Sequence, residues 1–365
     1  MESMHISEAK DPLQWDTFLS KQQYRPFLQS WTMGEVYRDI GQPPIRLMVQ
    51  EKDKILATCF GHIVPAKRGK HLSIPYGPIR SDYVHDATEI FALIVSTLKE
   101  KAQELGCSFI RVSPFIPQGM AEQQFRAFGA VDAPLHLLAE HIWHLPLTVK
   151  DYWGDPTVNP AAPRDEKEIL MQMRQTTRNL IRRAEKEGVT IEASPDPIGD
   201  LPLFLKLHEE TRKRHAFTPY TNAFFAAQVK HFAPRNEVTL YLAHFQGEVI
   251  AASIHMHAFG ETSYHHGASA HTKVPASYLL QWRAIQDALK RGDHIYNFWG
   301  IAPLCASGSG RQTPDPKHPF AGVTLFKTGF GGKPFPLMHC MDIPLSKRYY
   351  GTRLFETLRK WRRGF

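Results

Sequence analysis

Cysteine is scarce in this 365-residue chain, and its four cysteines lie far apart without a CxxC pair. This spacing excludes a dense disulfide framework and a cysteine-based zinc site, and it favours a reducing compartment. Long apolar runs are also missing, so no segment reaches the roughly 20 apolar residues that span a bilayer. The first residues, MESMHISEAKDPLQW, lack the basic start and apolar stretch of a signal peptide. We therefore expect a soluble, cytoplasmic protein.

The usual motifs of several enzyme classes are absent. The sequence contains no GxxxxGKS/T, GxGxxG, HExxH or GxSxG, so phosphate-loop hydrolysis, a Rossmann cofactor, zincin chemistry and a serine nucleophile all lack their marks. Cys305 falls in a polar loop without an evident base, and we do not expect it to be a nucleophile.

Histidine is abundant, with 19 residues. His255, His257, His265 and His266 fall in one predicted hairpin, which leaves a metal site or aromatic-rich sheet packing as alternatives. Because no carboxylate or cysteine is spaced to complete a ligand set, we favour packing and predict no metal.

The formal net charge of +8 gives the surface a positive field that attracts polyanions or anionic lipid. Residues 347–363 hold seven basic residues against Glu356 alone, with Leu354, Leu358 and Trp361 at helical spacing. This pattern predicts an amphipathic basic helix. It either serves nucleic acid or a membrane surface, or it is a solvated helix face.

The apolar periodicity predicts two similar halves. The first half is expected to hold strands 45–50, 55–64 and 71–76, a helix 86–105, a strand 109–112, a helix 121–128 and a last strand 141–145. The second half repeats this order with strands 238–244, 249–257 and 262–266, a helix 276–290 and a strand 295–298. Gly106 and Gly292, which end the two long helices, lie 186 positions apart.

This regular offset indicates a duplicated β-β-β-α-β-α-β unit. We therefore predict an α/β fold of α+β type with mixed sheets, built from two tandem GNAT-like acyltransferase domains. We expect domain 1 at residues 1–155 and domain 2 at residues 160–333, joined by the Pro-rich linker DPTVNPAAPRDE, with segment 334–365 packing back on domain 1.

A further helix is predicted from about Asp165 to Glu187. Arg174, Arg178 and Arg182 recur every four residues and would form one stripe on it. Such a stripe either holds phosphates or is simply solvated.

A direct-transfer enzyme needs no protein nucleophile, because an activated ester or thioester donor only has to be aligned with an amine while its oxyanion is stabilised. A buried lysine near a glycine-rich turn would suit that task. LFKTGFGGK places Lys327 in such a position.

Several segments, taken together and in order, resemble the FemABX family. They are FLQSWTMGEVYR (27–38), IPYGPI (74–79), RQTTRNLIRRAEKEGV (174–189), ETRKRHAF (210–217), YHHGAS (264–269), YLLQWRAIQDALKRG (278–292), IYNFWGI (295–301) and GVTLFKTGFGG (322–332). The resemblance covers nearly the whole chain and implies a pair of GNAT-like domains, in agreement with the duplication. Thr211–Phe232 is too short for the long helical arm of some relatives, so the chain looks like the FemX-like branch without it.

The resemblance implies an aminoacyltransferase of peptidoglycan biosynthesis. Such an enzyme moves an amino acid from aminoacyl-tRNA to the stem-peptide amine of a lipid-linked or UDP-linked precursor, and so builds cell-wall cross-bridges. It implies no cofactor beyond this co-substrate, and we expect a monomer with peripheral contact to the inner membrane surface. Two alternatives stay open: an acyl-CoA-dependent GNAT N-acyltransferase, although the pyrophosphate loop R/Q-x-x-G-x-G/A is missing, and an inactive RNA-binding relative.

The resemblance also implies roles for single residues. Lys327 and Tyr264 would be catalytic, Lys327 by polarising the ester carbonyl. The implied substrate-binding residues are Arg214, Tyr220, His266, Arg38, Tyr37 and Trp299. Relatives that bind a nucleotide-linked precursor carry a lysine where this chain has Tyr37 followed by Arg38. Without the arm, Arg174, Arg178 and Arg182 become candidates for binding tRNA or phosphate.

Overall fold

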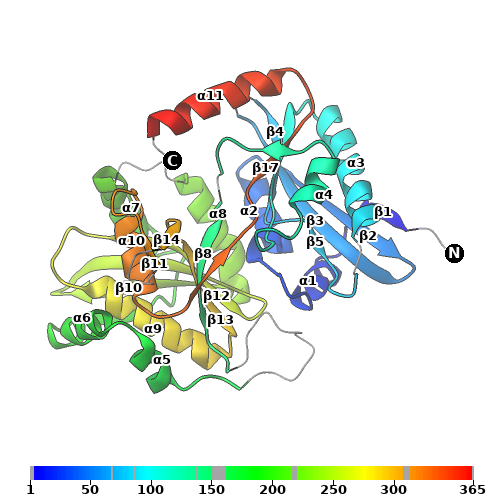
Figure 1. Ribbon diagram of the computed structural model, residues 1–365. Coiled ribbons are helices and arrows are strands. Elements are labelled where there is room, and N and C mark those ends of the chain that lie inside the picture. The colour runs from blue at the N-terminus through cyan, green and yellow to red at the C-terminus, as the bar shows by residue number, and fades with distance from the viewer. Residues whose placement is uncertain are drawn as a thin grey trace. The chain divides into compact units, whose positions relative to one another are not determined.

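The computed structural model describes residues 4–66, 69–84, 87–136, 138–149, 162–215, 220–306 and 312–363. The chain forms two compact units (Figure 1). Unit 1 comprises Met1–Glu140 and Pro336–Phe365, and unit 2 comprises His141–Phe335. Most of the expected Pro-rich linker lies outside the described residues. No helix in the described ranges is both long and apolar enough to cross a membrane.

The sheet of unit 1 has the strand order β1-β2-β3-β4-β6-β17-β7, with β5 paired to β3. Its neighbours pair antiparallel except β4 and β6, which are parallel. The strands are β1 (His5–Glu8), β2 (Pro44–Glu51), β3 (Lys54–Val64), β4 (His71–Pro75), β5 (Ile79–Arg80), β6 (Phe109–Ser113), β7 (Val131–Asp132) and β17 (Met341–Pro344). The helices are α1 (Pro12–Ser20), α2 (Trp31–Asp39), α3 (Thr88–Glu104), α4 (Glu122–Ala127) and α11 (Arg348–Arg363).

The sheet of unit 2 has the order β16-β8-β13-β12-β11-β10-β9. The strands are β8 (His141–Pro146), β9 (Thr190–Ala193), β10 (Val238–Phe245), β11 (Glu248–Ala258), β12 (Glu261–Ser269), β13 (Ile295–Gly300) and β16 (Lys333–Pro336), and β14 (Leu304–Ala306) pairs separately with β15 (Gln312–Pro314). The helices are α5 (Glu166–Gln172), α6 (Gln175–Lys186), α7 (Leu201–His215), α8 (Asn222–Phe232), α9 (Ala276–Arg291) and α10 (Ala321–Thr328).

The two sheets match strand for strand. Strands β1, β2, β3, β4, β6 and β17 of unit 1 occupy the places that β9, β10, β11, β12, β13 and β8 occupy in unit 2. The single parallel pair, β4 with β6, corresponds to the parallel pair β12 with β13. Helices α3 and α9 each precede the second strand of that pair. The predicted mixed α/β fold and the duplication are therefore confirmed.

The strand at 141–145 differs from expectation. It was predicted to be the last strand of the first domain, but β8 pairs with β13 in unit 2, with Asn297 opposite His144. The reason is packing, since Leu145 belongs to the apolar core of unit 2. The equivalent place in unit 1, beside β6, is taken by β17. The structure thus divides the chain after Glu140 and Phe335, and not near residue 155.

The predicted helix 165–187 is two helices. Met173 and Arg174 have extended backbone, with ψ of 152° and 143°, and separate α5 from α6. Tertiary contacts stabilise this break: Met173 is buried in the core, and the backbone N–H of Arg174 donates to the carbonyl of Gly329 at 2.9 Å.

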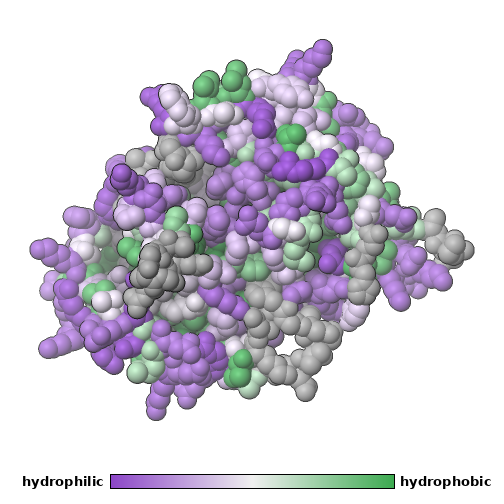
Figure 2. Space-filling view, in the orientation of Figure 1, coloured by the Kyte–Doolittle hydropathy of each residue, from purple (hydrophilic) through white to green (hydrophobic). Residues whose placement is uncertain are grey.

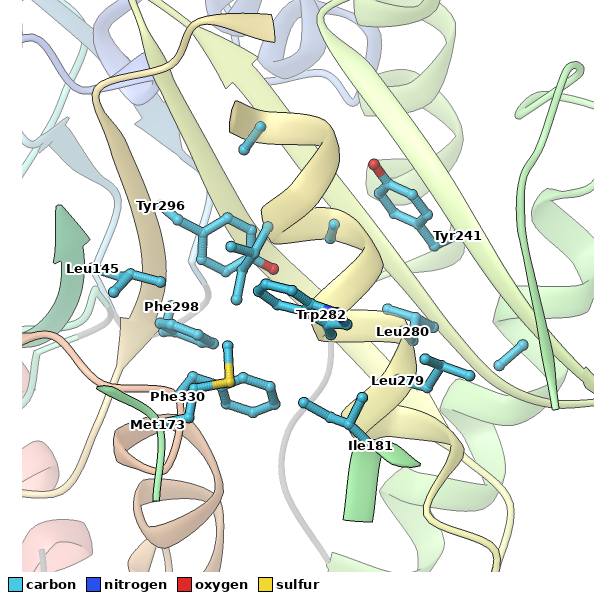
Figure 3. Packing of buried hydrophobic residues seen from close by; sticks show 14 of the residues in the cluster. Leu145, Met173, Ile181, Tyr241, Leu279, Leu280, Trp282, Tyr296, Phe298 and Phe330 are labelled. Carbon is cyan, nitrogen blue, oxygen red and sulfur yellow. The ribbon is translucent and has the colours of Figure 1, made fainter. Parts of the chain in front are cut away.

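Helix α9 supplies much of the core of unit 2. Trp282 packs in one cluster with Phe298 of β13 and with Phe330, which follows α10 (Figure 3). The helix ends at Gly292, whose φ of 81° lies in the left-handed region that favours glycine.

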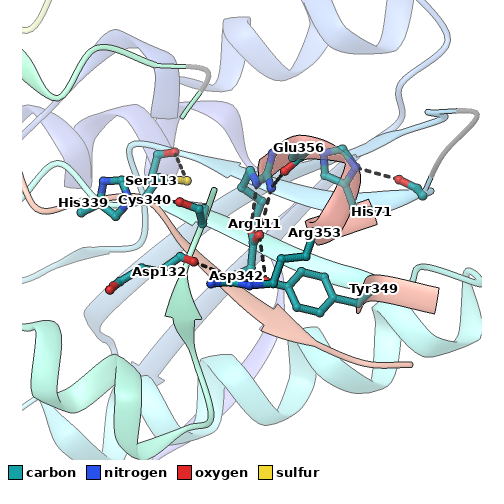
Figure 4. Close-up of polar contacts among 12 residues, drawn as sticks. His71, Arg111, Ser113, Asp132, His339, Cys340, Asp342, Tyr349, Arg353 and Glu356 are labelled. Carbon is teal, nitrogen blue, oxygen red and sulfur yellow. Dashed lines mark hydrogen bonds and ion pairs between the residues drawn. The ribbon is translucent and has the colours of Figure 1, made fainter. Parts of the chain in front are cut away.

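A buried ion pair fastens the C-terminal segment within unit 1. The guanidinium of Arg111 on β6 binds both carboxylate oxygens of Asp342 on β17, at 2.8 and 2.9 Å. It also binds Glu356 of α11 at 2.7 Å (Figure 4). Because both carboxylates share one cation, strand β17 and helix α11 are held to the same point of the sheet.

Candidate active site

Lys327 lies near the end of α10 and is 7% exposed. Its Nζ atom donates a hydrogen bond to the carbonyl of Gly300 at 2.5 Å and lies 5.7 Å from the ring centre of Tyr264. Burial lowers the pKa of Lys327 to about 7. The side chain is therefore partly deprotonated near neutral pH, and strongly shifted groups of this kind are frequent at functional sites.

Tyr264 lies on β12, and its ring covers Gly267. A Cβ atom at Gly267 would come within 1.8 Å of the tyrosine Oη, so the segment YHHGAS needs glycine at that position. Desolvation raises the pKa of Tyr264 to about 12. The phenol hence stays protonated at neutral pH and keeps a hydrogen-bond donor.

A series of buried polar side chains, linked by hydrogen bonds, begins at the Tyr264 ring. His255 of β11 stacks on that ring with centroids 5.4 Å apart. Its Nε2 is 2.7 Å from the hydroxyl of Tyr296, which donates to Gln281 at 2.5 Å. Because burial lowers the pKa of His255 to about 3, the imidazole is neutral. Nothing in the sequence pattern singled out Tyr296 or Gln281.

The remaining histidines of the predicted hairpin also serve packing and hydrogen bonds. His257 lies 2.8 Å from both Thr239 and Thr262. Within the described ranges, none of His255, His257, His265 or His266 belongs to a cluster of three ligand side chains. That this hairpin binds no metal stays a prediction.

Trp299 follows the buried part of β13 in a strained conformation. Its φ of 64° is unusual for a bulky residue, and its backbone N–H is held by the side chain of Asn297 at 2.7 Å. Asn297 in turn donates to Glu261 at 2.9 Å. Strain of this kind tends to persist where the surroundings fix a functional side chain. The polar pair Glu261–Asn297 is a feature that the sequence analysis did not identify.

His265 connects Trp299 with a second aromatic group. Its ring lies 4.8 Å from Trp299 and 3.9 Å from His266, and His266 lies 5.5 Å from Tyr220. Three residues predicted to bind substrate, Tyr220, His266 and Trp299, thus meet around one imidazole. The Nε2 atom of His266 is buried and makes no hydrogen bond within the described residues.

Arg214 lies at the exposed end of α7. Its Nη2 donates to the carbonyl of Ser269 at 3.0 Å, so it meets β12 at the last residue of the strand that carries Tyr264. Ser269 also lines an open pocket of about 300 Å³. Thr272, Lys273 and Ser277 line it, together with other residues at the start of α9. The N-terminus of a helix and a lysine both favour an anionic ligand.

The three arginines of the predicted stripe differ in their contacts. Arg174 binds Thr328 at 2.8 Å and also the carbonyl of Leu325. Arg178 binds the carbonyls of Met171 and Met173 at 2.9 and 2.6 Å, at the end of α5. The Arg174 side chain therefore binds groups of α10, whereas Arg178 satisfies backbone carbonyls next to the break between α5 and α6. Arg182 is exposed, and the described residues give its side chain no hydrogen bond or ion pair.

The other two predicted substrate-binding residues lie in unit 1. Tyr37 is buried and stacks on His62 with ring centres 3.6 Å apart. Arg38 is exposed and forms an ion pair with Glu35. Nearby, the side chain of Gln29 binds the backbone of Phe60 and Pro75, which joins the segments FLQSW and IPYGPI.

A crystal structure of FemX matches with a TM-score of 0.76 and 16% identity, covering 96% of this chain and all of that one. L-PGS from Bacillus licheniformis matches with a TM-score of 0.52 and 15% identity over 98% and 99% of the two chains. A tandem GNAT protein from the clavulanic acid biosynthesis pathway matches with a TM-score of 0.50 and 10% identity over 94% and 99%.

These similarities confirm two GNAT-like domains. No protein with a curated function matches the sequence. The model of the FemAB family, however, matches residues 11–250 and 246–357, which together span nearly the whole chain. The protein therefore belongs to the FemAB family.

Proposed function

We propose that this protein transfers an aminoacyl group from aminoacyl-tRNA to the stem-peptide amine of a peptidoglycan precursor. Membership of the FemAB family supports acyl transfer in general. The observation that carries the proposal is Lys327, a buried lysine with a pKa of about 7 beside a tyrosine that keeps its proton. Such a pair suits a reaction in which a carbonyl oxygen becomes negatively charged.

In the proposed reaction the acceptor amine attacks the ester carbonyl of the charged tRNA. A C–N bond forms and the C–O ester bond breaks, and the proton lost by the amine goes to the leaving ribose hydroxyl. Lys327 polarises the carbonyl and stabilises the oxyanion, while the Tyr264 hydroxyl orients the acceptor. The donor ester is already activated, so the scheme needs no cofactor and no protein nucleophile.

The neighbouring side chains are assigned to substrate binding. Tyr220, His266 and Trp299 supply rings around His265, and the exposed face of Tyr220 is available to a ligand because 41% of the residue is accessible. Arg214 would meet an anionic group near Ser269. In unit 1, Arg38 and Tyr37 keep their proposed role with the precursor.

The tRNA is assigned to the basic side of unit 2. Helix α6 carries Arg182, Arg183 and Lys186 on exposed positions, and Arg183 binds the carbonyl of Lys273 at the pocket before α9. Phosphates are bound by such arginines and by helix N-termini. Arg174 and Arg178 would then position the helix, with less direct contact to phosphate.

The same pocket favours a second candidate, an acyl-CoA-dependent N-acyltransferase, because CoA also presents phosphates to the N-terminus of a helix. Two experiments distinguish the candidates. In the first, the purified chain is incubated with charged tRNA and a lipid-linked or UDP-linked pentapeptide. In the second, it is titrated with acetyl-CoA in a calorimeter. Extension of the stem peptide, read by mass spectrometry, supports the proposal. Heat of binding with acetyl-CoA and no extension supports the second candidate, and tRNA binding without any transfer indicates an inactive RNA-binding relative.

The location of the reaction is proposed to be the cytoplasmic face of the membrane. Helix α11 is anchored through Glu356 and Tyr349, yet it exposes Leu354, Leu358 and Trp361 by 63%, 55% and 85%. Figure 2 shows apolar side chains among hydrophilic ones at the top of the view, over α11. A basic helix with such an apolar stripe is typical of proteins that lie on anionic bilayers.

A further inference from the structure

Three potential metal ligands meet in unit 1, where the chain leaves this unit and where it returns. His136 and Glu140 lie in the outgoing segment, and His339 lies in the returning segment just before β17. The backbone holds the two segments together, since the N–H of Leu337 donates to the carbonyl of Glu140 at 2.7 Å.

The distances suit one metal ion. The Oε2 atom of Glu140 lies 2.8 Å from Nδ1 of His339 and 3.7 Å from Nδ1 of His136. One ligand atom from each side chain falls within 4.8 Å of the other two. A tetrahedral zinc ion with bonds of about 2.0–2.1 Å keeps its ligand atoms roughly 3.4 Å apart. Small side-chain movements therefore complete the coordination.

Outer hydrogen bonds already orient two of the ligands. The Nε2 atom of His339 lies 3.1 Å from the carbonyl of Ala133, to which it must donate, and this leaves Nδ1 directed at Glu140. The second oxygen of Glu140 accepts the backbone N–H of Cys340 at 2.8 Å. A histidine tied to a backbone carbonyl through its other nitrogen is the usual arrangement at metal sites.

His136 distinguishes a metal site from an ordinary ion pair. His339 and Glu140 alone would form a satisfied pair, and that pair does not need a third side chain. The His136 side chain nevertheless reaches the same carboxylate, with Nδ1 3.7 Å from Oε2, and 49% of its surface is exposed. This exposure leaves room for water as a fourth ligand. Two imidazoles and one carboxylate are a ligand set that Zn²⁺ binds well.

We propose that His136, Glu140 and His339 bind one Zn²⁺ ion that fastens the outgoing segment of unit 1 to the returning one. The role is structural, because the ion would join two stretches of chain that lie 199 positions apart. The inference is independent of the proposed transfer reaction.

The test uses the full chain, freed of metal with a chelator and titrated with zinc chloride in a calorimeter. We expect one saturable site per chain and a higher melting temperature with zinc. His136→Ala is the decisive variant, because it removes one ligand and leaves the Glu140–His339 contact in place. It should weaken zinc binding by about tenfold or more and reduce the thermal shift measured at the same zinc concentration.

His244→Ala is the matched control. His244 also lies 2.8 Å from a carboxylate, that of Glu192, but no third ligand is near enough to form a set with them in the described residues. Zinc binding should be unchanged in this variant. The proposal is overturned if the unmodified chain shows no saturable site, or if His136→Ala binds zinc as tightly as the unmodified chain does.

Discussion

The Nζ atom of Lys327 lies 2.5 Å from the carbonyl oxygen of Gly300, so a helix-borne ammonium group is held against the end of strand β13. This contact orients the lysine while leaving its charge on the side of Tyr264.

Replacing Lys327 by alanine should lower the turnover of aminoacyl transfer by about a hundredfold, because the oxyanion loses its main stabilising group. The measurement is the rate of stem-peptide extension at saturating substrates. Lys317→Ala, at an exposed lysine ten positions earlier, is the control and should keep the normal rate. Equal rates for Lys327→Ala and the unmodified chain would remove this residue from the mechanism.

The pKa of Lys327 also predicts how stability depends on pH. Burial lowers this pKa to about 7 in the folded chain, whereas an unfolded lysine titrates near about 10.4. Between these values the unfolded state binds more protons, so the contribution of Lys327 to the free energy of unfolding rises with pH.

Lys327→Met should remove that contribution. Urea unfolding of both proteins at pH 7 and pH 9 measures it, and other groups largely cancel in the comparison. The unmodified chain should gain stability relative to the variant between the two pH values. A constant difference would contradict the lowered pKa.

Gly267→Ala should displace the ring of Tyr264, since the new Cβ would lie 1.8 Å from the tyrosine Oη. We expect loss of transfer activity of about tenfold or more and destabilisation of about 1–3 kcal/mol, the usual cost of overpacking. Activity assays and urea unfolding measure the two effects. Gly322→Ala on α10 is the control, because a Cβ there meets nothing within 4 Å. A fully active Gly267→Ala would show that the position of Tyr264 is unimportant.

The exposed stripe of α11 should bind anionic vesicles. Replacing Leu358 and Trp361 together by serine removes apolar contact area, so we expect binding to phosphatidylglycerol vesicles to fall by about tenfold or more in a sedimentation assay. Leu13→Ser, at a residue that is 75% exposed on α1, should change nothing. Unchanged binding of the double variant would exclude α11 as the contact.

Local patterns in the sequence predicted most elements closely. The helix expected at 276–290 is observed at Ala276–Arg291, because apolar spacing and a terminal glycine mark it clearly. The break between α5 and α6 was missed because its cause is remote: the N–H of Arg174 binds the carbonyl of Gly329. No window of sequence shows such a partner.

In the candidate site, too, features with a local sequence signal were predicted and features that depend on remote contacts were missed. Resemblance and a glycine-rich context pointed to Lys327 and Tyr264, but the burial that lowers the lysine pKa arises only in the folded unit. The carbonyl that holds the lysine belongs to Gly300, 27 positions away in the sequence. The chain from His255 through Tyr296 to Gln281 joins three elements, so its members look like ordinary core residues in the sequence. The ligand set of His136, Glu140 and His339 was likewise hidden by the long separation between its members.

The placement of β17 has a consequence for how the protein is made. This strand lies between β6 and β7, and its Asp342 is the ion-pair partner of Arg111, 231 positions earlier. During synthesis all of residues 141–335 leave the ribosome before this strand does. Unit 2, which is an insertion in unit 1, is therefore able to fold first. Until β17 is made, the sheet of unit 1 lacks the strand between β6 and β7. A ribosome that stalls before residue 341 would leave β6 with an unpaired edge, and an unpaired edge is a known starting point for aggregation.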